Sequence, residues 1–236
     1  MHRIYRGLAG LLVGLTLAGC ATMESPGSAA DSDAAATAER FALLKAERPA
    51  ELTAFLRAMP KGGDLHNHLV GTIYAENFIA WAVADGRCLI VATQTIAPAP
   101  CDARAGRPAM AEAMKSGDAY NRLIDALSTR NYALREVSGH DQFFATFARF
   151  DAAAAGREGD QLAEAMVRAA DQNIPYLELM DSTGMGAAIG LGARVGWDDD
   201  LARLRRKLVD AGLPTIVAQA RAGFDAMEAR ARQILD

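Results

Sequence analysis

The chain has 236 residues, of which 51% are hydrophobic, so it is long enough to form one sizeable core. Its 25 basic and 29 acidic residues give a formal net charge of −4. Lysine and arginine form no concentrated patch, which argues against a nucleic-acid-binding protein.

The first 20 residues indicate export. Arg3 and Arg6 precede an apolar run that is too short to span a bilayer. The run ends in Leu-Ala-Gly-Cys, which resembles a bacterial lipobox, and this resemblance implies cleavage before Cys20 and lipidation of its sulfur. The alternative is an ordinary signal peptide with a chance cysteine. We expect residues 1–19 to be a lipoprotein signal peptide, and the mature protein to be exported and anchored to a bacterial membrane on its periplasmic or cell-surface side.

The next segments alternate between a linker and regular structure. Residues 20–36 are small, polar and unpatterned, which favours a flexible tether. Apolar spacing predicts a helix over 37–58 with an interruption at Pro49. A short strand is predicted at 62–69 and a helix at 74–84.

Residues 85–117 contain glycine, proline and two cysteines, and we expect an insertion rather than a core element. An oxidising compartment and an even number of cysteines after Cys20 favour a disulfide between Cys88 and Cys101. Closing a loop of about 15 residues in this way would stabilise the fold by about 3 kcal/mol. Two free thiols are the alternative, and zinc binding is less favoured because no other Cys or His lies near either one.

The second half of the chain is predominantly helical, with one clear strand. Helices are predicted at 118–128, 141–154, 159–172, 198–211 and 215–235. The compact apolar run at 173–180 directly follows a helix, an order typical of α/β folds. Residues 182–196 are glycine-rich, and we expect a mobile loop over a sheet end. They are no dinucleotide fingerprint, because Ile189 stands where a third glycine is needed, and no Walker pattern is present.

Two histidines stand one residue apart on the first predicted strand. Residues i and i+2 of a strand share a face, so His66 and His68 should converge while Asn67 points away. Two imidazoles on one face can bind a divalent metal ion, usually zinc. Leu65 and Leu69 flank the pair, as expected for a strand end buried in a barrel. The alternative is two partly buried histidines in ordinary hydrogen bonds.

The surroundings of this pair resemble the adenosine deaminase family, and more closely its secreted, growth-factor-like branch. The resemblance begins with Met-Pro-Lys-Gly at 59–62, Leu-His-x-His at 65–68 and Gly71. It continues through the cysteine-marked insertion, "HDQFFATFARFD" at 140–151 and "NIPYLELM" at 173–180. Together these segments extend the resemblance over residues 50–236.

The resemblance implies a (β/α)8 TIM barrel with the active site at the carboxyl ends of its strands. His66 and His68 would be the first two zinc ligands. The family completes the site with a third histidine, an aspartate and a proton-shuttle glutamate from later strands. The implied reaction is zinc-dependent hydrolytic deamination of adenosine or a related purine nucleoside to inosine and ammonia. His140 and Glu178 are candidate substrate-side groups, and the alternative for His140, a surface residue at a helix start, is the more favoured of its two interpretations.

The sequence departs from the family in two respects. Val70 stands where many intracellular members have an aspartate that contacts the sugar. The four histidines, His2, His66, His68 and His140, include no third-ligand motif, and no shuttle glutamate can be assigned, so the catalytic residues are unknown. We therefore expect residues 37–236 to be an incomplete, N-terminal part of the barrel that is inactive alone. The alternatives are a lipid-anchored, non-catalytic binding protein on the same scaffold and another amidohydrolase-type metal hydrolase. The sequence does not indicate an oligomeric state.

Overall fold

The computed structural model describes residues 27–236, which fall into two compact units divided after Leu56. The described part of the first unit contains α1 (Gly27–Glu47) and the start of α2 (Pro49–Ala58). The predicted interruption is confirmed, because proline fits the first position of a helix and disfavours helical backbone at the preceding Arg48. Residues 27–36 of the expected tether lie within α1. The predicted signal peptide and Cys20 lie outside the described residues.

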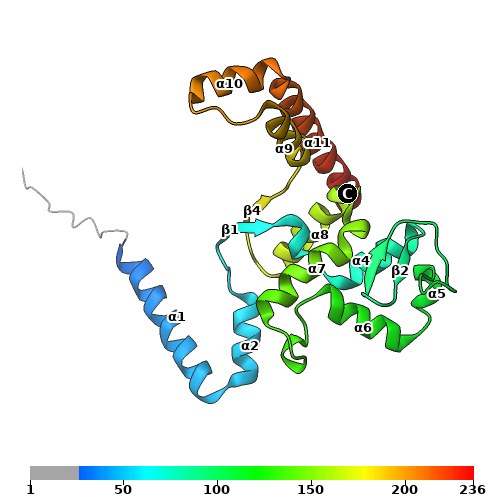
Figure 1. The fold of residues 1–236 in the computed structure, drawn as a ribbon. Helices are drawn as coiled ribbons and strands as arrows, with labels where there is room; N and C mark the ends of the chain where they lie inside the picture. The colour runs from blue at the N-terminus through cyan, green and yellow to red at the C-terminus, as the bar shows by residue number, and fades with distance from the viewer. Residues whose placement is uncertain (1–26) are drawn as a thin grey trace, which may run out of the picture. The chain divides into compact units, whose positions relative to one another are not determined.

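The second unit is a helix-rich α/β structure that contains two small sheets (Figure 1). Its elements are β1 (Gly63–His68), α3 (Leu69–Thr72), α4 (Ala75–Ala84), β2 (Cys88–Ile90), β3 (Thr95–Ala97), α5 (Met110–Ala113), α6 (Gly117–Leu127), η1 (Tyr132–Leu134), α7 (Gly139–Ala154), α8 (Glu158–Asp171), β4 (Tyr176–Met180), α9 (Met185–Val195), α10 (Leu201–Asp210) and α11 (Leu213–Leu235). Both predicted strands are confirmed. Residues 27–236 form no closed barrel.

The parallel sheet consists of β1 and β4 (Figure 1). Gly63 pairs with Tyr176 at one end and His68 pairs with Met180 at the other. The long connection between the two strands contains all the helices from α3 to α8, as parallel pairing requires a crossover. Within the described residues each strand has only this one partner, so both sheet edges are unpaired.

The main hydrophobic core lies among α4, α6, α7 and the antiparallel hairpin of β2 and β3. Phe78 of α4 is 0% exposed and stacks on Phe150 of α7, with ring centroids 4.3 Å apart. Leu89 and Ile96 of the hairpin are both buried in this core. The expectation that 85–117 would be an insertion outside the core was therefore wrong. The two short strands in this segment supply apolar side chains that bury the apolar side chains of α4 and α7.

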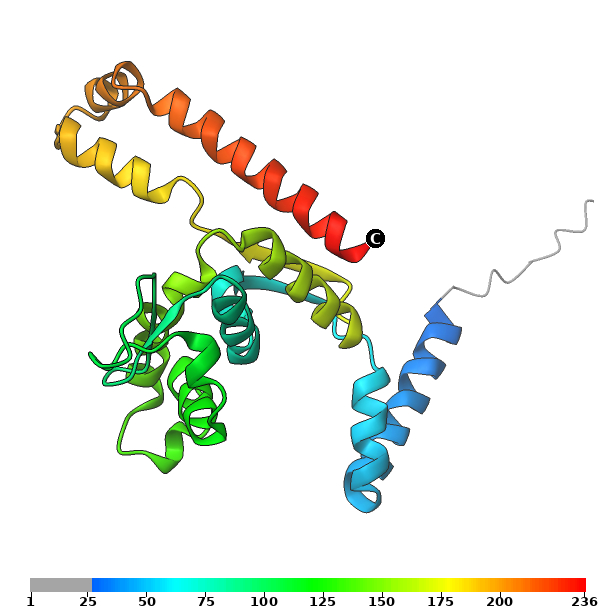
Figure 2. The ribbon, with the colours of Figure 1, turned by 90° about the vertical axis from the view of Figure 1, so that its right-hand side faces the viewer.

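A smaller cluster joins the parallel sheet to the later helices. Leu69 and Leu179 pack with Leu162 and Ala165 of α8 and with Met227 of α11. Figure 2 shows α8 lying beside the two strands, with α11 running along α8. This cluster covers one face of the sheet and leaves the other face open.

The glycine-rich segment is a helix, α9, and not the mobile loop expected from its composition. Gly184 and Gly196 have positive φ angles of 81° and 72° and stand at the two ends of α9. The glycines inside cost about 1 kcal/mol each relative to alanine. Burial of Leu191, which is 1% exposed, and packing against α10 and α11 outweigh that cost.

In the described part of the chain, no helix is both long and apolar enough to cross a membrane.

Candidate metal and substrate site

A β-bulge in β1 determines which side chains share a face with the histidines. Asp64 pairs with Leu177 and Asn67 with Leu179, so Leu65 and His66 together lie opposite the single residue Glu178. A bulge of this kind shifts the alternation of side chains by one position. Asp64 and Asn67 consequently share the covered face, where Asn67 Nδ2 donates a hydrogen bond of 2.8 Å to Asp64 Oδ2.

The opposite, open face of β1 carries Leu65, His66 and His68, all of which are exposed. Asn67 points away from the histidines, as predicted. Leu69 is buried as expected, but Leu65 is 64% exposed, which corrects the expectation that both leucines would be buried around the pair. Leu65 is exposed because no further strand or helix of the described residues covers this face.

The two imidazoles converge, with ring centroids 5.5 Å apart and ring planes inclined at 65°. Two imidazoles that bind one tetrahedral zinc ion through bonds of about 2.1 Å have centroids about 5 Å apart. The separation of the two rings is close to this value. Within residues 27–236, no group of three or more His, Cys, Asp or Glu side chains is arranged to hold a metal ion, so a third ligand is not supplied there.

Glu178 is the carboxylate nearest to the pair along the sheet ladder. It stands opposite the bulge that contains His66, and it lies on the exposed face of β4 with Tyr176. The Tyr176 hydroxyl donates a hydrogen bond of 3.1 Å to Glu178 Oε1. This bond raises the pKa of Tyr176, since the neighbouring negative charge stabilises the protonated phenol. The structure thus brings Glu178 and His66 onto one face.

A cavity of 360 Å³ lies at the carboxyl ends of the two strands. His68 and Val70 line it from β1 and α3, and Asp181, Ser182 and Thr183 line it from the segment after β4. Val70 offers no side-chain acceptor for a sugar hydroxyl. Asp181 Oδ1 accepts a hydrogen bond of 2.8 Å from the backbone N–H of Thr183, which fixes the carboxylate in its own turn.

Sequence reasoning missed Asp181 and the other carboxylates at this cavity, Asp151 and Glu158. A signal for Asp181 was present, because residues that directly follow parallel strands gather at the carboxyl edge of a sheet. Asp151 and Glu158 gave no such signal. They stand near the end of α7 and the start of α8, and only the packing of those helices brings them to the strands.

His140 is not brought to the histidine pair or to this cavity. It lies in the first turn of α7, where Ser138 caps the helix by accepting a hydrogen bond from the backbone N–H of Asp141. Its side chain is 76% exposed, lies 3.2 Å from Asp141 Oδ1 and packs against Phe144. The hydrogen bond from His140 lowers the pKa of Asp141.

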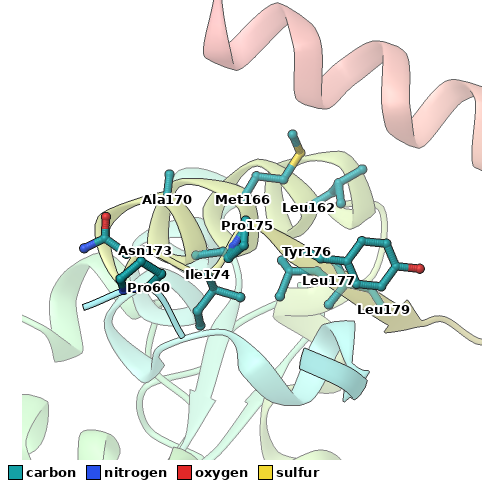
Figure 3. Close-up of a pocket in the computed structure, with 11 residues that line it drawn as sticks. Pro60, Leu162, Met166, Ala170, Asn173, Ile174, Pro175, Tyr176, Leu177 and Leu179 are labelled. Atoms are coloured by element: carbon teal, nitrogen blue, oxygen red, sulfur yellow. The ribbon is translucent and has the colours of Figure 1, made fainter. Parts of the chain in front are cut away.

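A cavity of 740 Å³ is an apolar groove between α8 and β4 (Figure 3). Leu162 and Met166 line it from α8, and Leu177 and Leu179 line it from β4. In Figure 3 the Tyr176 hydroxyl points away from these apolar side chains. Leu177 and Leu179 alternate with Tyr176 and Glu178, so the groove lies on the face opposite the histidines and is no extension of their site.

A disulfide closes part of the segment 85–117. Cys88 and Cys101 form a disulfide, with Cα atoms 5.4 Å apart. Cys88 is 0% exposed and starts β2, so the disulfide ties the surface segment around Cys101 to the main core. Neither cysteine contributes a thiolate that could bind zinc.

Comparisons of the chain with protein-family models, with curated proteins and with solved structures found no match.

Proposed function

We propose that the chain is part of a zinc-dependent hydrolase that deaminates adenosine or a related purine nucleoside to inosine and ammonia. The convergence of His66 and His68 at the end of a strand that pairs in parallel with β4 supports this most directly. The bulge adds support, since it gathers both imidazoles on one face and sets Glu178 opposite His66.

Each group has a distinct role in this proposal. His66 and His68 would hold a zinc ion, and that ion would supply Lewis-acid activation. The adjoining cavity at Asp181 receives the substrate, whose sugar cannot be bound by Val70. Glu178 orients the substrate as a hydrogen-bond acceptor, while Tyr176 restrains its carboxylate. No shuttle glutamate is assigned, and no further zinc ligand joins the two histidines within residues 27–236.

The fold part of the proposal is a (β/α)8 barrel of which β1 and β4 are the first two strands. The support is physical: both edges of the parallel sheet are unpaired in the described residues, and one face carries exposed Leu65. Unpaired edges are costly or aggregation-prone features that closure into a barrel removes. The 236-residue chain would then lack several strands and be inactive alone.

Metal binding and activity of the purified 236-residue chain test this proposal. We expect saturable but weak zinc binding, no stoichiometric zinc after dialysis and no inosine from adenosine. His66→Ala and His68→Ala should each remove the zinc binding, while the matched control His140→Ala should leave it unchanged. Inosine formation with one zinc ion per molecule would contradict the missing-ligand argument. Zinc binding that is insensitive to both substitutions would contradict the metal site itself.

In a longer protein that supplies the further strands, His66→Ala or His68→Ala should abolish turnover, because each removes a zinc ligand. Purine preference over other amide or amine substrates distinguishes the deaminase from another amidohydrolase-type hydrolase.

One observation favours a second candidate, a lipid-anchored binding protein without catalysis. The described residues contain no third metal ligand. If a longer protein with the same N-terminal part bound purine nucleosides but converted none of them, this candidate would replace the first.

We also propose that the protein is exported and held on the membrane through lipid on Cys20. The chain should partition into detergent phase, and Cys20→Ala should release it into the aqueous phase. Recovery of both forms in the aqueous phase would refute the anchor.

A further inference from the structure

A second polar hollow lies apart from the histidine pair, and it is rich in arginine. It has a volume of 670 Å³ and is formed by the turn between β2 and β3, by α6, by the segment after η1 and by α7. Its charged lining residues are Arg122, Arg135, Arg149 and Asp125. Three guanidinium groups and one carboxylate give this lining an excess of positive charge.

Two of the arginines have no carboxylate partner in the described part of the chain. Arg122 pairs with Asp118 at the rim. Arg135 donates instead to the backbone carbonyl of Asp125 at 3.0 Å, and Arg149 donates to that of Ala126 at 3.0 Å. Burial of Arg149, together with repulsion from Arg135, lowers the pKa of Arg149. Both cations line the same hollow, and the charge of Arg135 is near enough to act on Arg149.

Capping of α6 explains only part of this arrangement. Arg135 and Arg149 do satisfy carbonyls in the last turn of α6, which favours positive charge. Gln142 already donates to the same Asp125 carbonyl at 2.9 Å and to Ser128 at 2.7 Å. A guanidinium has five N–H donors, so one bond to a carbonyl leaves most of them available to the hollow.

The remaining walls leave room for a ligand and offer it hydroxyl groups. Ala145 and Ala148 line the hollow from α7 with small side chains next to Arg149. Thr93 and Thr95 line it from the hairpin turn, where the Thr93 hydroxyl donates to that of Thr95 at 2.9 Å. The volume lies within the range of about 300–1,000 Å³ that is typical of small-molecule sites.

We propose that this hollow binds a small oxyanion, the phosphate or carboxylate group of a metabolite-sized molecule, between Arg135 and Arg149. The planar fork of a guanidinium matches both groups and can bind either with two parallel hydrogen bonds. The bound anion would neutralise Arg135 and Arg149, which form no ion pair with a carboxylate among the described residues. This site is separate from the histidine pair, so the inference does not depend on the deaminase proposal.

Calorimetric titration of the whole 236-residue chain at constant ionic strength tests the site, with inorganic phosphate as one probe and acetate as the other. We expect one anion per chain for at least one probe, and the stronger probe identifies the preferred group. Arg135→Gln and Arg149→Gln should each weaken binding at least tenfold, since each removes a charge-assisted contact. Glutamine keeps a side-chain N–H donor but removes the charge.

Two further variants separate the site from general charge and from misfolding. Arg104→Gln removes an equal charge from an exposed residue outside the hollow and should leave affinity unchanged. Ala148→Leu keeps every arginine but fills the hollow with a good helix former, and it should also weaken binding tenfold or more. No saturable heat with either anion, or an equal loss in Arg104→Gln, would overturn the proposal.

Discussion

The closed core, formed by α4, α6, α7 and the β2–β3 hairpin, differs sharply from the open sheet, formed by β1 and β4. In the closed core, Phe78 and Leu123 are each 0% exposed, and a disulfide ties Cys88 of β2 to Cys101. In the open sheet, the histidines and Glu178 stand on an uncovered face between two unpaired edges. Stability and candidate chemistry are therefore carried by different parts of the same unit.

The largest effect should follow from a cavity in the closed core. Phe78→Ala removes a fully buried ring that stacks on Phe150, and it should lower the free energy of unfolding by about 3–5 kcal/mol. Urea unfolding followed by circular dichroism measures this loss. Leu65→Ala on the open sheet is the matched control and should change stability by less than about 0.5 kcal/mol, because Leu65 is 64% exposed. Equal losses would contradict the division into closed core and open sheet.

The disulfide should give the next largest effect. Replacing Cys88 and Cys101 together by alanine should cost about 3 kcal/mol, because the unfolded chain regains the freedom of a loop of about this length. The same urea experiment on the wild-type chain with and without reductant provides the control, and reduction should produce most of the loss. Unchanged stability in both tests would show that the hairpin is held by packing alone.

The same contrast separates what sequence could and could not predict. The helices of the closed core and both strands of the open sheet follow from local apolar spacing, which is a property of neighbouring residues. The bulge at Leu65 and His66 depends on pairing with Glu178, more than 100 residues away, and no local pattern encodes it. This bulge nevertheless determines which side chains lie on the same face of the sheet as His66 and His68.

Errors arose where packing overrode local preference. α9 contains three interior glycines that favour a loop, yet Leu191 buries its side chain and the helix forms. Leu89 and Ile96 stand in short strands that composition assigned to a peripheral insertion, yet the closed core is incomplete without them. At the candidate site, the spacing of His66 and His68 predicted their convergence, whereas Asp151 and Glu158 reach the cavity only through the placement of α7 and α8.

An ion pair joins the end of α4, in the closed core, to the start of α8, which covers the open sheet. Arg157 pairs with Asp85, and their side chains are 22% and 25% exposed. The bond from Arg157 lowers the pKa of Asp85, so the pair stabilises the fold when pH is above the unfolded value of about 4 and loses this effect as pH falls through the lower folded value.

Asp85→Asn should therefore cost about 1 kcal/mol or less at pH 7, as expected for a partly exposed pair. The difference in unfolding free energy between wild type and variant should stay constant from pH 5 to 8 and shrink in more acidic solution. Asp118→Asn, at a more exposed pair, is the control and should change stability less. If the difference in unfolding free energy between wild type and Asp85→Asn grew on acidification, the pKa of Asp85 would not be lowered by folding, contrary to this prediction.

The smallest effect on stability should come from the residues that carry the proposed chemistry. Both imidazoles are exposed and pack against each other, so the double variant His66→Ala, His68→Ala should alter the free energy of unfolding by less than about 0.5 kcal/mol. Without metal, wild type and double variant should unfold at the same urea concentration. With excess zinc, only the wild type should gain stability, because only its folded state binds the ion. A large loss of unfolding free energy in the double variant without metal would instead mean that the histidines stabilise the sheet. Stability and candidate chemistry would then depend on the same residues.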